Sequence, residues 1–364
     1  MAQVRQTMAA TGTDVLALSV GSDLPWLIGY EAMPLERLTM LVVPIDAPPT
    51  LVIPGLEAPR VVTHDGLFEI RPWGETEDPV AIAAGLIGSA LSVAVGDQMW
   101  SRFLVDLQHQ APGVSWSRAS TVTAPLRAVK DQAEIDRLAA AAAGVDRVAA
   151  ALQGGEIPLI GRTEAEVSAE LGQRILAEGH ATVNFAIVAS GANAASPHHH
   201  AGAKVIKAGE VVLCDFGGTT DEPHGEPGYC SDITRCVYTG EPPAEFAEAY
   251  AALHESQQQG VAAATVGTRA GAVDGVSRKI LEDANLGEWF IHRLGHGIGV
   301  EAHEDPYLVE SNDQPLVAGN AFSIEPGFYI PEKWGARLED IVVATDDGPR
   351  ALNQADHHLA IVEA

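Results

Sequence analysis

Two stretches in the middle of the chain are the most informative about its structure: Val211-Val-Leu-Cys-Asp215-Phe-Gly-Gly218 and Tyr229-Cys-Ser-Asp232-Ile-Thr-Arg235. In the first, an apolar strand ends in an acid, and in the second an acid opens another strand. The Gly- and Pro-rich interval between them suits a hairpin connection, and two antiparallel strands joined in this way can place both aspartates side by side. A single Asp at a strand end is more often a cap or turn residue. Two facing carboxylates, however, repel each other unless a cation or a proton lies between them.

A histidine segment follows, His292-Arg-Leu-Gly-His296-Gly-Ile-Gly-Val-Glu-Ala-His303. The glycines on both sides of His296 allow close approach of the backbone and leave the imidazole unobstructed. Their spacing is not that of a phosphate-binding loop, because the Lys and the following helix of that motif are missing. Alone, His296 would more often be an ordinary core histidine than a metal ligand.

Two further acids lie among apolar strand residues, in Phe322-Ser-Ile-Glu325-Pro-Gly-Phe-Tyr-Ile330 and Gly335-Ala-Arg-Leu-Glu339-Asp-Ile-Val-Val343. Glu is rarely buried at such positions unless it is paired or coordinated. The segment 331–335 between the two stretches has the composition of a turn, which would place Glu325 opposite Glu339. The sequence therefore predicts a second facing pair of acids.

Two acid pairs and one imidazole together predict a metal site. Four carboxylates match the charge of two divalent cations, and oxygen-dominated ligation with one histidine suits Mn²⁺, Co²⁺, Fe²⁺ or Zn²⁺ rather than a thiolate site. Two such ions about 3.5–4 Å apart lower the pKa of a shared water and stabilise a tetrahedral oxyanion. We therefore expect hydrolytic chemistry.

The composition limits the partners that we expect. The chain has 364 residues, 46% of them hydrophobic, and a formal net charge of −27. An acidic surface disfavours nucleic acids and anionic membranes as partners. Three cysteines without CxxC spacing predict buried free thiols rather than disulfides or a thiolate zinc site. Without an apolar leader or a long apolar run, a soluble cytoplasmic protein is expected.

The pattern along the chain predicts two domains, 1–124 and 125–364. In the first, β-like runs at 15–20, 39–43, 50–53 and 92–95 and a helix at 81–90 indicate an α/β domain. A long helix at about 130–152 opens the second, followed by helices from Thr163 to about 178, at 243–264 and at 271–284. Strands are expected between them at 182–189, 211–216, 233–238, 321–324 and 338–344. The whole chain is therefore assigned to the α+β class.

The order and the residues of these motifs resemble those of the metallopeptidase family of methionine aminopeptidase, aminopeptidase P and prolidase, which has the pita-bread fold. The resemblance covers about 126–364 and rests on four features: the strand-ending Asp215 followed by Gly, the SDITR segment, HGIG with a later His, and EPG followed by R-x-E-D. The first third is similar to the creatinase-type N-terminal domain through 24–30 (LPWLIGY) and 36–38 (ERL). The presence of this N-terminal domain before the catalytic domain implies the proline-specific branch of the family.

The resemblance implies five metal ligands. Asp215 would chelate one metal, and Asp232 and Glu339 would bridge both. His296 and Glu325 would complete the other metal, with Glu325 also acting as the general base.

It also implies three catalytic side chains that do not bind the metals. His198, in the segment 188–200, would orient substrate or move a proton, and His303 would contact the scissile carbonyl or its oxyanion. Arg337 would support Asp215 or the substrate. One departure from the family is a longer interval between the two aspartates, and its surplus, 219–228, is expected to form a hairpin tip near the substrate entrance.

The function implied is hydrolysis of the Xaa-Pro bond of dipeptides by a hydroxide that bridges two divalent metal ions, with Mn expected and Co or Zn as alternatives. Short proline-containing peptides are the expected partners, and a homodimer is expected. Aminopeptidase P, acting on longer peptides, is the close alternative. A metal-free amidinohydrolase of the creatinase type and a non-catalytic peptide-binding module are remote alternatives, because all five ligands are present.

Overall fold

The computed structural model describes residues 1–64, 66–223 and 225–362, and its contacts divide the chain into two compact units. Met1–Arg127 and Glu222–Gly228 form the first unit, and Ala128–Asp221 and Tyr229–Ala364 form the second. The boundary expected between 124 and 125 lies inside helix α5 (Ser120–Arg127), which stays with the first unit. Within the expected hairpin tip at 219–228, Glu222–Gly228 group with the first unit, and His224 lies outside the described residues.

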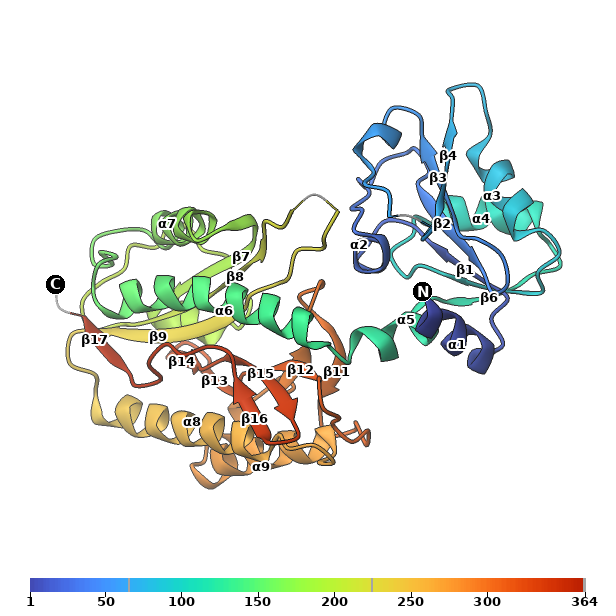
Figure 1. Cartoon of the computed structure of the whole chain (residues 1–364). Helices are drawn as coiled ribbons and strands as arrows, with labels where there is room; N and C mark the ends of the chain where they lie inside the picture. Colours follow the sequence, from blue (N-terminus) through green and yellow to red (C-terminus); the bar gives the residue numbers. More distant parts are fainter. Residues whose placement is uncertain (65, 224, 363–364) are drawn as a thin grey trace. The chain divides into compact units, whose positions relative to one another are not determined.

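A six-stranded mixed sheet organises the N-terminal unit, in the order β4-β3-β2-β1-β5-β6 (Figure 1). Strands β1, β2 and β3 pair antiparallel, whereas β3–β4, β1–β5 and β5–β6 pair parallel. Apolar side chains cover both faces of the sheet. The elements are α1 (Ala2–Thr11), β1 (Val15–Leu18), α2 (Asp23–Ile28), β2 (Met40–Pro44), β3 (Thr50–Pro54), η1 (Ala58–Arg60), β4 (Glu69–Trp73), α3 (Pro79–Ile87), β5 (Ser92–Val95), α4 (Ser101–Gln110), β6 (Ser115–Arg118) and α5.

The expected strands of this unit are confirmed, and the one expected helix is displaced. Helix α3 begins at Pro79 because the Asp78 side chain accepts hydrogen bonds from Val80 N and Ala81 N. It ends before Gly88, whose φ of 59° departs from the helical backbone. An Asp cap followed by Pro at the first position is a strong start signal, and the alanine run alone had placed the helix too late.

In the C-terminal unit, helices cover two sheets whose strands pair antiparallel, apart from β17, which pairs parallel with β9. A four-stranded sheet has the order β17-β9-β8-β7, a five-stranded sheet the order β11-β10-β12-β15-β16, and β13 and β14 form a hairpin. The first part of this unit contains α6 (Gln132–Gln153), α7 (Glu164–Ala177), β7 (His180–Ser190), η2 (Gly191–Ala195), β8 (Val211–Thr220) and β9 (Ile233–Thr239). The rest contains α8 (Ala244–Ala263), α9 (Ala270–Asp283), η3 (Gly287–Trp289), β10 (Gly295–Gly297), β11 (Glu304–Leu308), β12 (Ala321–Ile324), β13 (Gly327–Ile330), β14 (Trp334–Arg337), β15 (Asp340–Thr345), β16 (Gly348–Ala351) and β17 (Ala360–Val362).

Local sequence explains the long helices of this unit. Thr163 and Glu166 form the capping box expected at the start of α7, and Asp131 and Glu134 form a second one at the start of α6. Each box satisfies backbone N–H groups that a helix start leaves without partners. Helices α6 and α7 pack against the four-stranded sheet, and α8 and α9 pack against the five-stranded one (Figure 1).

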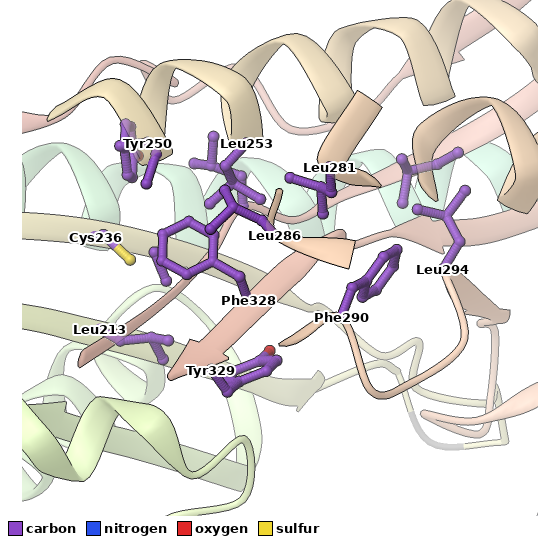
Figure 2. Packing of buried hydrophobic residues seen from close by; sticks show 14 of the residues in the cluster. Leu213, Cys236, Tyr250, Leu253, Leu281, Leu286, Phe290, Leu294, Phe328 and Tyr329 are labelled. Carbon is purple, nitrogen blue, oxygen red and sulfur yellow. The ribbon is translucent and has the colours of Figure 1, made fainter. Parts of the chain in front are cut away.

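The side-chain alternation of β8 and β9 positions the site. On β8, Val212, Cys214 and Phe216 pack toward α6 and α7. Leu213 faces the other way, into the core beneath α8 and α9 that Figure 2 shows, together with Phe328 and Leu253. Because side chains of a strand alternate between faces, Asp215 lies on the same face as Leu213, toward the second sheet.

All three cysteines are buried free thiols, as expected. Among the described residues, no helix has the length and apolarity that crossing a membrane requires.

Candidate metal centre

The register of β8 and β9 brings the first acid pair together. Asp215 stands opposite Thr234, and Phe216 stands opposite Ile233. Continuing this register places Asp232 one step further along, diagonal to Asp215 and on the same face. Both side chains are buried, Asp215 at 8% and Asp232 at 3% exposure.

The second pair arises in the same way from β12 and β15. Ile324 stands opposite Asp340, so the next residues outward, Glu325 and Glu339, face each other. The β13–β14 hairpin occupies the interval between them, with its turn at 331–333, inside the expected turn segment.

His296 reaches the acids from β10, which lies between β11 and β12. This position requires glycine on both sides. A Cβ atom on Gly295 would lie 1.9 Å from Ser323 O, and one on Gly297 would lie 2.2 Å from Asp305 O. The close backbone approach inferred from the HGIG motif is therefore present, and it places His296 Nε2 3.3 Å from Glu325 Oε1.

The five expected ligands converge, and His303 joins them. Potential ligand atoms lie within 4.8 Å of one another in three groups: Asp215, Asp232 and Glu339; His296, Glu325 and Glu339; and Asp232, His296 and His303. The groups share Asp232, Glu339 and His296, so they form one continuous cluster. Its residues come from β8, from β10 and from positions that directly flank β9, β11, β12 and β15.

The cluster contains more negative charge from its carboxylates than nearby positive charge balances, and the pKa values of its members are shifted accordingly. Burial, followed by repulsion from Glu339 and Asp215, raises the pKa of Asp232. Burial, followed by repulsion from Glu325 and Asp215, raises the pKa of Glu339, and burial also raises the pKa of Glu325. Burial lowers the pKa of His296 to about 4, so its imidazole is neutral at pH 7 and its ring nitrogen can ligate a metal.

The donor set fits divalent cations. Asp215 Oδ2 accepts a hydrogen bond from Arg337 Nη2 at 2.6 Å, but its buried Oδ1 has no hydrogen-bond partner among the described residues. A buried carboxylate oxygen without a donor is costly unless a cation completes it. Two hard or borderline divalent ions would complete this oxygen and would also neutralise the carboxylates that repel each other, with the neutral imidazole as a further ligand. The residues present therefore fit a pair of metal ions.

Hydrogen bonds from neighbouring side chains hold the carboxylates in place, and most of these neighbours are not predicted from the sequence. Thr234 Oγ1 donates to Glu339 Oε2 at 2.6 Å, and Ser323 Oγ donates to Glu325 Oε1 at 3.0 Å. Such partners orient ligands and tune their basicity. Alternation could have indicated both, because each lies two residues from an acid on the same strand face.

Arg337 holds Asp215 rather than facing open space. Its guanidinium also donates to Tyr329 Oη at 2.7 Å and to Thr234 Oγ1 at 3.1 Å, and its side chain is 3% exposed. Behind it, the fully buried Arg235 donates to the main-chain oxygen of Glu339 and to Asp340 Oδ1, both at 2.8 Å. The two arginines thus lock strand β9 to the β14–β15 segment.

Of the two expected catalytic histidines, His303 contacts the cluster directly, and His198 is linked to it through electrostatics. The ring of His303 stacks on that of His296 with centroids 3.8 Å apart, and His303 is exposed. Desolvation and then the nearby His296 lower the pKa of His303 to about 4, with a smaller contribution from the charge of His198. His198 is itself exposed.

Known families and structures match the whole chain. The model of metallopeptidase family M24 matches residues 133–346, and that of the creatinase/prolidase N-terminal domain matches residues 1–129. The probable dipeptidase PepE of Mycobacterium tuberculosis is 41% identical over 358 residues, which cover 97% of this chain and 93% of that protein. The Xaa-Pro dipeptidase of Lactobacillus helveticus is 32% identical over 368 residues, covering 99% and 98%.

A solved structure agrees with these relatives. The prolidase from Thermococcus sibiricus superposes with a TM-score of 0.91 at 32% identity, covering 99% of this chain and 97% of that one. The expected fold, a pita-bread catalytic domain behind a creatinase-like domain, is confirmed. Because one family model covers more than half of the chain and the relatives match nearly all of it, the chain belongs to metallopeptidase family M24 and carries a creatinase/prolidase N-terminal domain.

Proposed function

We propose that the protein is a metal-dependent Xaa-Pro dipeptidase, a metallo-exopeptidase that cleaves the bond before proline in dipeptides. The observation that supports it most is the convergence of four carboxylates and a neutral imidazole in one cluster, in a chain related to proteins named dipeptidase and Xaa-Pro dipeptidase. The Xaa-Pro bond is a tertiary amide without an N–H group, so its hydrolysis suits a site that needs no donor from the substrate.

Asp215, Asp232, His296, Glu325 and Glu339 would hold the metals, with Asp232 and Glu339 shared. Two divalent ions bound there would supply Lewis acidity and an acidified water. Glu325, whose pKa is raised by burial, would accept the proton of the attacking water and return it to the proline nitrogen. His303, neutral at pH 7, can donate a hydrogen bond to the scissile carbonyl oxygen, and His198 would orient the substrate.

An exposed cation favours dipeptides over longer peptides. Arg293 is exposed, its guanidinium carbon lies 4.5 Å from the centroid of the Tyr307 ring, and it pairs with no carboxylate among the described residues. Tyr307 lies on β11, beside the β10 strand that carries His296, and the charge of Arg293 contributes to the low pKa of both His296 and His303. A guanidinium at this position can bind the free carboxylate that follows the scissile bond by one residue in a dipeptide.

We expect Arg293→Gln to raise KM for Ala-Pro about 10-fold to 100-fold, the equivalent of one charged hydrogen bond. Cleavage of Ala-Pro amide, which lacks the carboxylate, should change little. Steady-state kinetics with both substrates, and with Arg293→Lys as the variant that keeps the charge, measure the difference. Equal losses on the acid and the amide would contradict this role.

The alternative within the family is an aminopeptidase P activity on longer peptides. A comparison of Ala-Pro with Ala-Pro-Ala under added Mn²⁺ separates the two, since a dipeptidase should have the higher kcat/KM for Ala-Pro. Preference for the tripeptide would overturn the dipeptidase proposal and leave the metal-dependent hydrolase in place.

The proposal also covers the native metal, the oligomeric state and the cellular location of the protein. Manganese is proposed because carboxylate-rich ligation with one imidazole suits it, and Co²⁺ and Zn²⁺ are the competing ions. A homodimer and a cytoplasmic location are proposed as well. Metal analysis of protein purified without added metal, together with sedimentation, tests the first two.

A further inference from the structure

Glu164 is a fully buried carboxylate that lies outside the metal centre, with 0% of its surface exposed. It is the first residue of α7, directly after the Thr163 cap. The capping box does not use its side chain, which turns inward from the helix and binds another part of the chain.

Among the described residues, the hydrogen bonds to this carboxylate come from one short segment, 190–199. Oε1 accepts from Ser190 N and Ser190 Oγ, both at 2.7 Å, and from Asn193 Nδ2 at 3.1 Å. Oε2 accepts from the same Asn193 amide at 3.1 Å and from His199 Nε2 at 2.8 Å. Three residues of the 190–199 segment are therefore hydrogen-bonded to the same buried carboxylate.

The charge on Glu164 makes these contacts strong. Burial alone would raise the pKa of this carboxyl, but the hydrogen bonds from Ser190, His199 and Asn193 outweigh burial and the pKa lies below its ordinary value. The partial positive charge of the helix N-terminus also favours the anion. Hydrogen bonds to an ionised acceptor are shorter and stronger than neutral ones.

The 190–199 segment contains His198. His199 is half-buried and turned toward Glu164, whereas its neighbours His198 and His200 are exposed. The ring of His199 is anchored inward, whereas the side chain of the preceding His198 is exposed. The charge of His198 contributes to the low pKa of His303. Lys204 Nζ, which donates to Ser190 Oγ at 2.6 Å and to Glu210 at 2.8 Å, holds the same end of β7.

We propose that Glu164 is a positioning residue for the hydrolytic reaction: through Ser190, Asn193 and His199 it fixes the 190–199 segment so that His198 faces the substrate beside His303. This inference rests on the proposed function for its kinetic consequence. Glu164 itself contacts none of the metal-ligand candidates among the described residues, so its effect is expected to appear in kcat rather than in metal content.

The test is a double-mutant cycle between Glu164→Gln and His198→Ala. Glutamine keeps the size of the side chain but replaces one acceptor oxygen with a donor, which opposes the donors of Asn193 and His199. We expect Glu164→Gln to lower kcat for Ala-Pro about 10-fold to 100-fold, the effect of displacing a catalytic group by about 1 Å. KM and bound metal should stay close to the wild type. In the His198→Ala background the same change should have almost no further effect.

Two further variants separate positioning from folding. His199→Leu should reproduce most of the loss while Ser190 and Asn193 still satisfy Glu164, and His199→Gln, which retains a donor, should restore part of it. Glu170→Gln is the matched control: it lies on the same helix and pairs with Arg162 and Arg174 near the surface, so kcat should not change.

Losses that multiply in the Glu164→Gln/His198→Ala double variant, or an equal loss in Glu170→Gln, would overturn the proposal. The proposed function fails separately, if the wild-type protein cleaves no Xaa-Pro substrate under any metal. In that case, crystals of Glu164→Gln still decide the positioning claim, because an undisplaced His198 would refute it without any activity measurement.

Discussion

Replacement of Glu339 by glutamine is expected to lower kcat/KM for Ala-Pro by about 10³-fold or more, because several kcal/mol of transition-state stabilisation depend on the metals. Glu339 belongs to two of the three candidate ligand groups, so its loss disturbs both proposed metal positions at once. Glutamine keeps an oxygen to accept the hydrogen bond from Thr234, and the fold should therefore be retained. Kinetics and metal content of the purified variant are the measurements.

The matched control is Asp347→Asn, which removes an exposed acid after the same strand, β15. It should leave both activity and metal content at wild-type values. Unchanged turnover in Glu339→Gln would remove the metal mechanism and favour the metal-free amidinohydrolase. No turnover by either the wild type or the variant would favour a peptide-binding module.

The acid cluster could be predicted because its information is local. Asp215 lies inside strand β8 and the other three acids lie next to a strand end, and strand periodicity alone determines which face each of them occupies. Asp215 and Asp232 share one connection, as do Glu325 and Glu339, so two hairpin-like pairings recover both facing pairs. The glycines beside His296 pointed to a crowded backbone, and the distances to Ser323 and Asp305 show the crowding directly.

The supporting residues could not be predicted, because their information is long-range. Glu164 resembles any first-turn acid of a capped helix, and its partners begin 26 residues later with Ser190. The position of His199 is explained only by its hydrogen bond to Glu164. Arg235 was visible as part of a motif, but its bond to Asp340 joins strands 105 positions apart. The residue pattern of a single helix or strand cannot predict contacts between segments so far apart in the chain.

Removal of the metals should have the largest effect on stability, and the effect should grow with pH. In the metal-free protein, burial and mutual repulsion raise the pKa values of Asp232 and Glu339 above their ordinary values of 3.8 and 4.5. Between those values and the raised ones, the folded protein binds more protons than the unfolded chain. The free energy of unfolding of the metal-free protein therefore falls as pH rises through this window. Below pH 3.8 both states are protonated at these groups, and the contribution disappears.

Divalent ions replace the protons that these carboxylates would otherwise hold, so metal binding competes with protonation and strengthens as pH rises. We expect saturating Mn²⁺ to raise the free energy of unfolding by about 2.7 kcal/mol per site at 100 times Kd, and to raise Tm more at about pH 8 than at about pH 5.5. Thermal unfolding of chelator-treated and Mn²⁺-loaded protein at both pH values is the measurement. The metal-free Glu339→Gln variant is a control in which stability should change in the opposite direction to metal affinity. With one repelling charge removed, it should be more stable at about pH 8 than the metal-free wild type, although it binds metal less well. A metal-free wild type whose Tm does not fall with pH, or a Glu339→Gln variant less stable than it, would mean that these four acids are balanced by the protein itself and need no cations.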